Sequence, residues 1–347
     1  MSTLENKSQL ENLSFIKTVL MILVILDHSV AFWTGGWFTC NPALSAPFLG
    51  YISSFLGMFH IYAFVFVSGY LFYYLKFEKG QYRKYIPFVV NKAKRLLIPY
   101  AFISLIWAIP FAVAFNKYDI VEILKRYALG IAPSQLWFLL MLFIVFAVFY
   151  PLSNFFAKKN VLGLIVVLAV YASSLVLPSI VPNIFQIFRA CSCLPLFWLG
   201  FKIRQYDIRI LKRIPALIWV VVCILLFVLY CYLKDFQGII FTLLRFGLEF
   251  VLHIVGTLMA FYGLQKIADF INKKAKKARF FSFISRSTMI IYLFHQQIIY
   301  LTVYWLNGYL NPYLHALVNF VTAITISLLI AFLMGKFKWT RFLVGEK

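Results

Sequence analysis

Charged side chains are scarce in this sequence, and acidic side chains are the scarcest. Only 13% of the 347 residues are charged, with 11 Asp and Glu against 33 Lys and Arg. Hydrophobic residues make up 63% and the mean hydropathy is +0.88, far from the composition of soluble domains. The net charge of +22 would suit a nucleic-acid-binding protein, but the apolar runs leave almost no water-facing surface to carry it. These values indicate a polytopic membrane protein without a nucleic-acid partner.

Paired cysteines and short metal-binding motifs are also missing. The number of cysteines is odd, most of them lie inside apolar runs, and none forms a CxxC pair. No HExxH spacing is present either. We therefore predict that the cysteines are packing residues and that the protein has no metal site; they are Cys40, Cys191, Cys193, Cys223 and Cys231.

The sequence has no Pro/Ser-rich linker, no low-complexity tract and no obvious internal repeat. No small-residue cleavage signal follows the first apolar segment, which we expect to be retained as a helix. We predict one integral membrane domain over residues 1–347, with no appended soluble domain.

Apolar runs of about 20 residues, the length that crosses the hydrocarbon core, occur ten times. The predicted fold is therefore all-α, a bundle of about ten transmembrane helices. The predicted spans are 14–34, 50–75, 96–115, 134–153, 161–181, 184–201, 214–233, 239–263, 281–306 and 313–335.

Basic residues are concentrated in alternate loops. The lysine- and arginine-rich loops are 76–95, 202–213 and 266–279, whereas 35–49, 179–183 and 307–312 contain neither residue. The loop 116–133, with three basic residues, is a mild exception. Because basic loops stay on the cytoplasmic side, both termini are predicted to be cytoplasmic.

The first span contains two adjacent ionisable residues, Asp27 and His28, in the stretch LMILVILDHSVAFW. Lys17 lies eleven residues earlier, so Lys17 and His28 share one helix face about 16 Å apart along the axis. Asp27 points about 100° away from His28 and would reach a neighbouring helix. Ionisable groups inside a membrane are costly and usually mark a site or pathway, so both are candidate catalytic residues. The alternative is that they only form hydrogen bonds between helices.

Further ionisable residues lie at comparable depth in other spans. His60 and His295 are expected in the central or outer half of the membrane. Arg245, Glu249 and His253 follow one another at a spacing of four residues and form a polar stripe, which is either functional or a packed ion pair. The remaining candidate is Arg189, which lies near the outer end of its span and could instead reach the interface.

Five blocks of the sequence together resemble the acyltransferase 3 family, integral membrane O-acyltransferases that modify bacterial cell-surface glycans. Their order and spacing match over nearly the whole chain. The blocks are FHIYAFVFVSGYLF (59–72), NKAKRLLIPY (91–100), LWFLLMLF (136–143), LPLFWLGFKI (194–203) and SRSTMIIYLFHQ (285–296).

The resemblance implies roles for individual residues. His28 matches the family's presumed catalytic histidine, and Lys17 stands where an arginine is usual, which keeps the charge but loses the planar fork. Lys92 and Arg95 match an Arg-x-x-Arg pair thought to meet the phosphates of acyl-CoA, with a possible contribution from Lys94. Ordinary anchoring by basic residues is the alternative explanation for these three. Some members carry an extra esterase-like domain that this chain lacks, so the acyl group would pass directly to the acceptor or to a partner.

The predicted function is that of an O-acyltransferase in the bacterial cytoplasmic membrane. It would move an acyl group, by expectation acetyl from acetyl-CoA, to a hydroxyl of a surface glycan or lipid-linked sugar. His28 would act as the general base or carry the acyl group. The residues predicted to contact the acceptor or the developing oxyanion are His60, Arg189, Arg245, Glu249, His253, Tyr292 and His295.

A transporter or flippase of lipid-linked glycans or small solutes is the alternative function, because intramembrane ionisable residues also serve proton coupling. The lack of inverted repeats and of broken helix pairs argues against it. The sequence leaves open the identity of the glycan, the choice between acetyl and succinyl, and the oligomeric state.

Overall fold

The computed structural model describes residues 3–115, 119–274 and 279–346, and these ranges contain helices and no β-strand. Ten helical segments within them are long and apolar enough to cross a membrane, which confirms the predicted all-α bundle. Parts of the predicted loops 116–133 and 266–279, namely 116–118 and 275–278, lie outside the described residues. The ten spans are Glu11–Thr34, Pro47–Glu78, Tyr85–Phe115, Ser134–Lys158, Asn160–Ser179, Ile184–Tyr206, Ala216–Leu233, Ile239–Ile271, Phe281–Leu306 and Pro312–Met334.

The α-helices include these spans and several shorter helices between or after them. In chain order they are α1 (Thr3–Val30), α2 (Pro47–Gly57), α3 (His60–Tyr73), α4 (Tyr85–Ile103), α5 (Ile109–Phe115), α6 (Ile120–Ala128), α7 (Trp137–Lys158), α8 (Asn160–Val176), α9 (Ile187–Tyr206), α10 (Arg209–Arg213), α11 (Ala216–Leu233), α12 (Ile239–Lys274), α13 (Arg279–Leu306), α14 (Pro312–Met334) and α15 (Lys338–Leu343).

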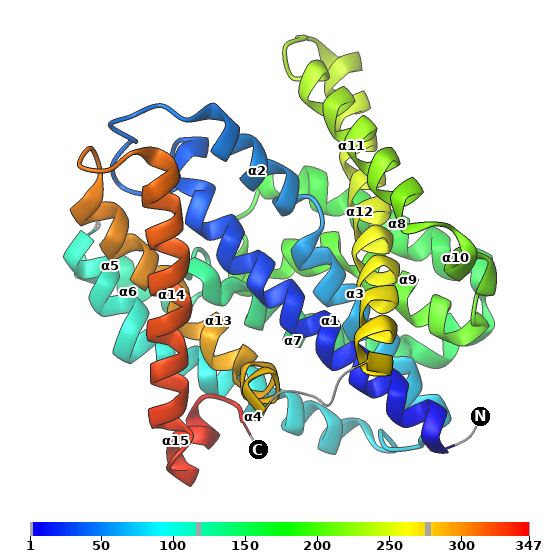
Figure 1. The fold of residues 1–347 in the computed structure, drawn as a ribbon. Coiled ribbons are helices and arrows are strands. Elements are labelled where there is room, and N and C mark those ends of the chain that lie inside the picture. The colour runs from blue at the N-terminus through cyan, green and yellow to red at the C-terminus, as the bar shows by residue number, and fades with distance from the viewer. Residues whose placement is uncertain (1–2, 116–118, 275–278, 347) are drawn as a thin grey trace.

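Helix α1 runs through the middle of the bundle, with α13 and α14 on one side and α12 on another (Figure 1). A helix satisfies its own backbone hydrogen bonds, which hydrocarbon cannot do, so apolar runs of this length fold as helices. The side chains of Ile16, Leu20, Val24 and Ile25 are almost completely buried. The central position explains why α1 can carry polar residues that contact several neighbours.

Helices α3 and α9 cross with their backbones in direct contact. A Cβ atom on Gly69 would lie 1.9 Å from the Phe197 carbonyl oxygen, and one on Gly200 would lie 2.0 Å from that of Phe66. Small residues at helix interfaces allow such close approach in membrane bundles. The two glycines therefore fix the distance between the second and sixth spans.

Two spans near the centre are irregular. The second span, which the sequence suggested as one run, is interrupted after α2 at Met58 and Phe59 before α3 begins. The third span contains Pro99 and continues through a π-helical turn, Ser104–Ala108, into α5. Such turns inside helices often mark functional positions.

The first and last spans bring both ends of the described chain to the same end of the bundle (Figure 1). This arrangement follows from the even number of spans. That this end faces the cytoplasm remains a prediction from the basic loops. Helices α11 and α12 form a hairpin at the edge of the bundle, where most of α11 is exposed.

Candidate active site

Helices α1 and α13 pack side by side and run in the same direction. Near their first turns in the membrane, the Ser14 and Ser285 hydroxyl oxygens are 2.7 Å apart. Further along, His28 Nδ1 lies 2.8 Å from His295 Nε2, and the two rings stack with centroids 4.9 Å apart. The sequence placed both histidines at similar depth but did not predict that they form a pair.

The partners of His295 determine which nitrogen of His28 is free. His295 Nδ1 lies 2.8 Å from the Tyr292 carbonyl oxygen and 3.1 Å from that of Ile291. A carbonyl oxygen only accepts, so His295 Nδ1 carries a proton and, in the neutral ring, Nε2 accepts from His28 Nδ1–H. His28 Nε2 then keeps its lone pair, which is the state required of a general base.

Asp27 faces away from this pair, as the helical geometry predicts. Its Oδ1 accepts a hydrogen bond of 2.6 Å from the Ser53 hydroxyl, and its Oδ2 lies 3.6 Å from His60 Nε2. His60 Nδ1 donates to the Leu56 carbonyl oxygen at 2.6 Å. At 3.6 Å the His60 Nε2 atom and the Asp27 carboxylate face each other without a direct hydrogen bond. This second pair joins α1 to the interrupted second span, beside the break.

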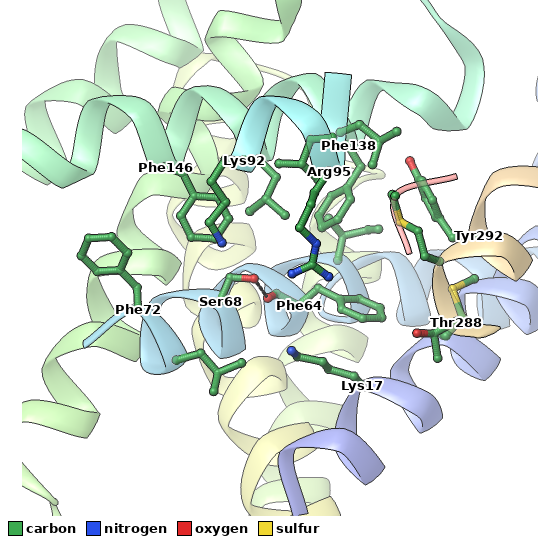
Figure 2. A pocket seen from close by; sticks show the side chains of 18 of the residues that line it. Lys17, Phe64, Ser68, Phe72, Lys92, Arg95, Phe138, Phe146, Thr288 and Tyr292 are labelled. Carbon is green, nitrogen blue, oxygen red and sulfur yellow. Dashed lines mark hydrogen bonds between the residues drawn. The ribbon is translucent and has the colours of Figure 1, made fainter. Parts of the chain in front are cut away.

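A cavity of about 350 Å³, here called the basic pocket, lies along α1, α3, α4, α7 and α13. Figure 2 shows the side chains of Lys17, Lys92 and Arg95 directed into it from α1 and α4. The Lys92 ammonium also lies 3.7 Å from the centre of the Phe146 ring. The described residues that line the pocket include no acidic side chain, so it is suited to an anion such as a phosphate.

The basic pocket extends toward the two histidines. Lys17, Met21 and Val24 line it and lie on the same stripe of α1 as His28, which follows one turn later. On α13, Tyr292 lines the pocket, and its ring centroid is 6.1 Å from that of His295. The Tyr292 hydroxyl donates to the Gln135 carbonyl oxygen, so in this structure it is not directed at a ligand.

A second cavity, of about 670 Å³, lies beyond the histidines and is here called the aromatic pocket. The Trp37 ring lies 5.7 Å from the His28 ring and 4.8 Å from the Tyr300 ring, measured between centroids. Six of its lining residues are Trp37, Phe38, Phe111, Arg126, Gln297 and Tyr300. Arg126 forms an ion pair of 2.9 Å with Glu122 on α6.

The two pockets occupy opposite ends of the same three spans. On α1 and α13 the residues of the basic pocket precede His28 and His295. Those of the aromatic pocket come later, in the segment 36–39 just after the first span and at Gln297 and Tyr300 on α13. The third span repeats this order, with Lys92 and Arg95 in the first pocket and Phe111 in the second. The histidine pair therefore lies between two cavities toward opposite ends of the bundle, although neither histidine is among the residues that line them.

Four of the predicted site residues lie elsewhere. His253 stacks on Tyr62 with ring centroids 3.7 Å apart, and its Nε2 is 3.8 Å from Glu249 Oε1. Arg245, which precedes Glu249 by one turn of the same helix, donates to Thr242 Oγ1, and Arg189 lies over the Trp137 ring. None of the four lines either pocket.

Two glutamines near the pair were not singled out from the sequence. Gln135 Nε2 donates to the Leu293 carbonyl oxygen at 2.8 Å and lies 2.6 Å from Gln297 Oε1, which ties the start of the fourth span to α13. Gln297 also lines the aromatic pocket. The signal available in the sequence was the adjacent pair Gln296 and Gln297, which follows His295 in an apolar run.

Among the described residues, no group of three or more His, Cys, Asp or Glu side chains is arranged to hold a metal ion. The three cations of the basic pocket could hold a charged co-substrate. A family model described as an acyltransferase domain matches residues 10–336. No curated protein and no solved structure matches the chain.

Proposed function

The chain belongs to the acyltransferase domain family, and from this premise we propose that it moves an acyl group from cytoplasmic acyl-CoA to a hydroxyl of an extracytoplasmic glycan. The observation that carries the proposal is the free His28 Nε2 between two pockets at opposite ends of the bundle. Acyl-CoA is charged and stays on the cytoplasmic side, whereas a surface glycan lies on the other. A base between the two compartments lets the substrates meet without either crossing.

The basic pocket is the proposed donor site. Lys17, Lys92 and Arg95 provide three positive charges for the phosphates of CoA. Lys17 and His28 are about 16 Å apart along α1, a distance that the extended pantetheine arm of CoA can span. The stripe through Met21 and Val24 would then guide the thioester to the histidine pair.

The proposed chemistry uses His28 as a general base. Its Nε2 takes the proton of the acceptor hydroxyl while the hydroxyl oxygen attacks the thioester carbonyl. The carbon–sulfur bond then breaks, the proton passes from His28 to the sulfur, and CoA leaves as the thiol. His295 holds His28 in the required tautomer throughout, and both histidines begin and end the cycle neutral.

The aromatic pocket is the proposed acceptor site. The rings of Trp37, Phe38 and Tyr300 offer flat apolar surfaces against which a sugar ring can pack, and Trp37 touches His28. A hydroxyl of a sugar held there would point at His28 Nε2. The acyl group is expected to be acetyl, and the membrane to be the bacterial cytoplasmic membrane.

The test uses membranes that contain the wild-type protein or the His28→Ala variant. Acetyl-CoA labelled in the acetyl group is added with a panel of glycan acceptors, and label in the glycan is counted. We expect transfer by the wild type and a loss of about 10²- to 10⁴-fold in His28→Ala, the usual effect of removing a general base.

His315→Gln is the matched control, because His315 is another buried histidine of the bundle, whose ring packs against Trp33 and whose Nε2 lies 3.2 Å from the Thr302 carbonyl oxygen rather than beside His28 or His295. It should transfer label like the wild type. Full activity in a folded His28→Ala protein, or no transfer by the wild type to any acceptor, would refute the proposal.

Transport of a lipid-linked glycan or small solute is a second candidate, and one observation favours it. The second span is interrupted between α2 and α3, and the Asp27–His60 pair lies beside the break. Interrupted helices with ionisable groups form the substrate and ion sites of many transporters. Glycan that crosses the membrane without acquiring label would identify this function.

A further inference from the structure

A third cavity, of about 420 Å³, adjoins the basic pocket and is here called the tail pocket. Its basic residues come from two parts of the chain, Lys94 and Arg95 on α4 and Lys338 and Arg341 on α15. Arg95 and Gly345 line both cavities. The two pockets therefore meet at Arg95, and the segment after α15 forms part of the wall between them.

The segment that follows α15 is firmly docked on α4. The Val344 side chain is 0% exposed and belongs to the main hydrophobic core. Gly345 has a positive φ of 77°, and a Cβ atom there would lie 2.7 Å from the Arg95 carbonyl oxygen and 2.9 Å from Pro99 Cγ. Only glycine fits this close approach, so the sequence holds Lys338 and Arg341 in a fixed relation to α4.

One acidic residue also lines the tail pocket. Glu346 Oε2 lies 4.0 Å from Arg341 Nε. Partial burial raises the pKa of Glu346, and the nearby Arg341 and Arg286 guanidinium groups oppose that rise. Four cations around one carboxylate leave the cavity with an excess of positive charge, as expected for a site that receives a phosphate dianion.

We infer that the tail pocket binds the ribose 3′-phosphate of acyl-CoA through Lys338 and Arg341, while the basic pocket holds the diphosphate and the pantetheine arm. This inference rests on the proposed function. In CoA the 3′-phosphate and the diphosphate are carried on the same ribose, so one ligand has to present two phosphate groups to neighbouring cation clusters. The two pockets that meet at Arg95 provide that arrangement.

The test compares the binding of CoA with that of 3′-dephospho-CoA, which lacks only this phosphate. The full-length protein is placed in phosphatidylcholine nanodiscs, and dissociation constants are measured by isothermal titration calorimetry. The wild type should bind CoA about tenfold or more tightly than 3′-dephospho-CoA, the usual effect of a lost charge-assisted contact. Lys338→Ala and Arg341→Ala should weaken CoA binding to a similar extent and leave 3′-dephospho-CoA binding unchanged.

Three further variants separate the possible explanations. Lys336→Ala removes a neighbouring exposed cation that lines none of the three pockets and should bind both ligands like the wild type. Lys92→Ala should weaken the binding of both ligands, because Lys92 lines the proposed site of the diphosphate and pantetheine arm, which both ligands contain. Glu346→Gln should strengthen CoA binding and leave 3′-dephospho-CoA binding unchanged, since it removes the competing carboxylate.

Equal affinity of the wild type for the two ligands would overturn the inference, as would an equal loss for both in Lys338→Ala. A headgroup site for anionic lipid is the other source of a phosphate. It would appear as weaker CoA binding in phosphatidylglycerol nanodiscs without any preference for CoA over 3′-dephospho-CoA, and would also overturn the inference. Binding is measured without an acceptor. The comparison of the two ligands can therefore be interpreted even if the protein does not transfer acyl groups to glycans. Absence of binding of either ligand to the wild type would refute the donor site and the inference together.

Discussion

His295 is expected to act on catalysis only through His28, and its replacement tests that expectation. In His295→Ala the Nδ1–H group of His28 loses its acceptor, at 2.8 Å in the structure. A buried donor left without an acceptor costs about 1–3 kcal/mol. If this cost raises the free energy of the transition state, in which His28 is protonated, the rate decreases about 5- to 150-fold. His28→Ala removes the base itself and should cost more, about 10²- to 10⁴-fold.

His295→Gln provides the conservative comparison. The glutamine side-chain oxygen can take the place of Nε2 and accept from His28, so this variant should keep more activity than His295→Ala. Its pH profile should also change. In the wild type, protonation of His28 Nε2 removes the base and protonation of His295 Nε2 removes the acceptor of the bond between the rings, so activity is lost as the pH falls and two groups contribute. In His295→Gln only His28 titrates, and the loss toward low pH should be less steep.

The assay is the initial rate of label transfer per mole of folded protein, with the folded amount taken from size-exclusion chromatography. The double variant His28→Ala/His295→Ala completes a double-mutant cycle, which measures whether the two effects are independent. If His295 acts only through His28, the double variant is as slow as His28→Ala alone. Effects that multiply, or a His295→Gln protein no better than His295→Ala, would refute the reasoning.

Three other predictions follow from the geometry. Asp27→Asn should retain most activity, because the amide can donate to His60 Nε2 and still accept from Ser53; a loss comparable with that of His28→Ala in the transfer assay would mean that the carboxylate charge is needed. Gly200→Ala should lower the free energy of unfolding by about 1–3 kcal/mol or more, because its Cβ atom would lie 2.0 Å from the Phe66 carbonyl oxygen. The loss is measured as a lower unfolding temperature in detergent. Gly263→Ala is the control and should have little effect, because a Cβ atom there would have nothing within 4 Å. Single cysteines placed in 307–312 should react with an impermeant thiol reagent on intact cells and those in 202–213 should not; the opposite pattern would reverse the orientation.

The sequence predicted most of what depends on position along one helix. The ten spans, the shared face of Lys17 and His28, and the direction of Asp27 away from His28 toward a neighbouring helix all follow from hydrophobic runs and helical periodicity, and the structure shows each of them. These features need no knowledge of which helices are neighbours. Depth in the membrane and direction around an axis are properties of a single segment.

What could not be predicted depends on the order of helices around the bundle. His28, His60, His253 and His295 all lie inside apolar spans, yet only His295 lies against His28. His253 faces Tyr62 on another side of the bundle, because α12 packs on α3 through that face. The tail pocket was missed for the same reason, since α15 is remote from α4 in sequence and short enough to be read as a basic tail.

The position of the histidine pair between two pockets has an electrical consequence. In the proposed reaction an acyl group moves outward past His28, and the hydroxyl proton moves inward to the sulfur. Moving one elementary charge across the membrane against 100 mV requires about 2.3 kcal/mol. Here a formal acyl cation and a proton exchange places, so no net charge crosses. Energised and de-energised membranes should therefore support the same rate of transfer, and the cell would need neither a proton gradient nor a membrane potential to run the reaction.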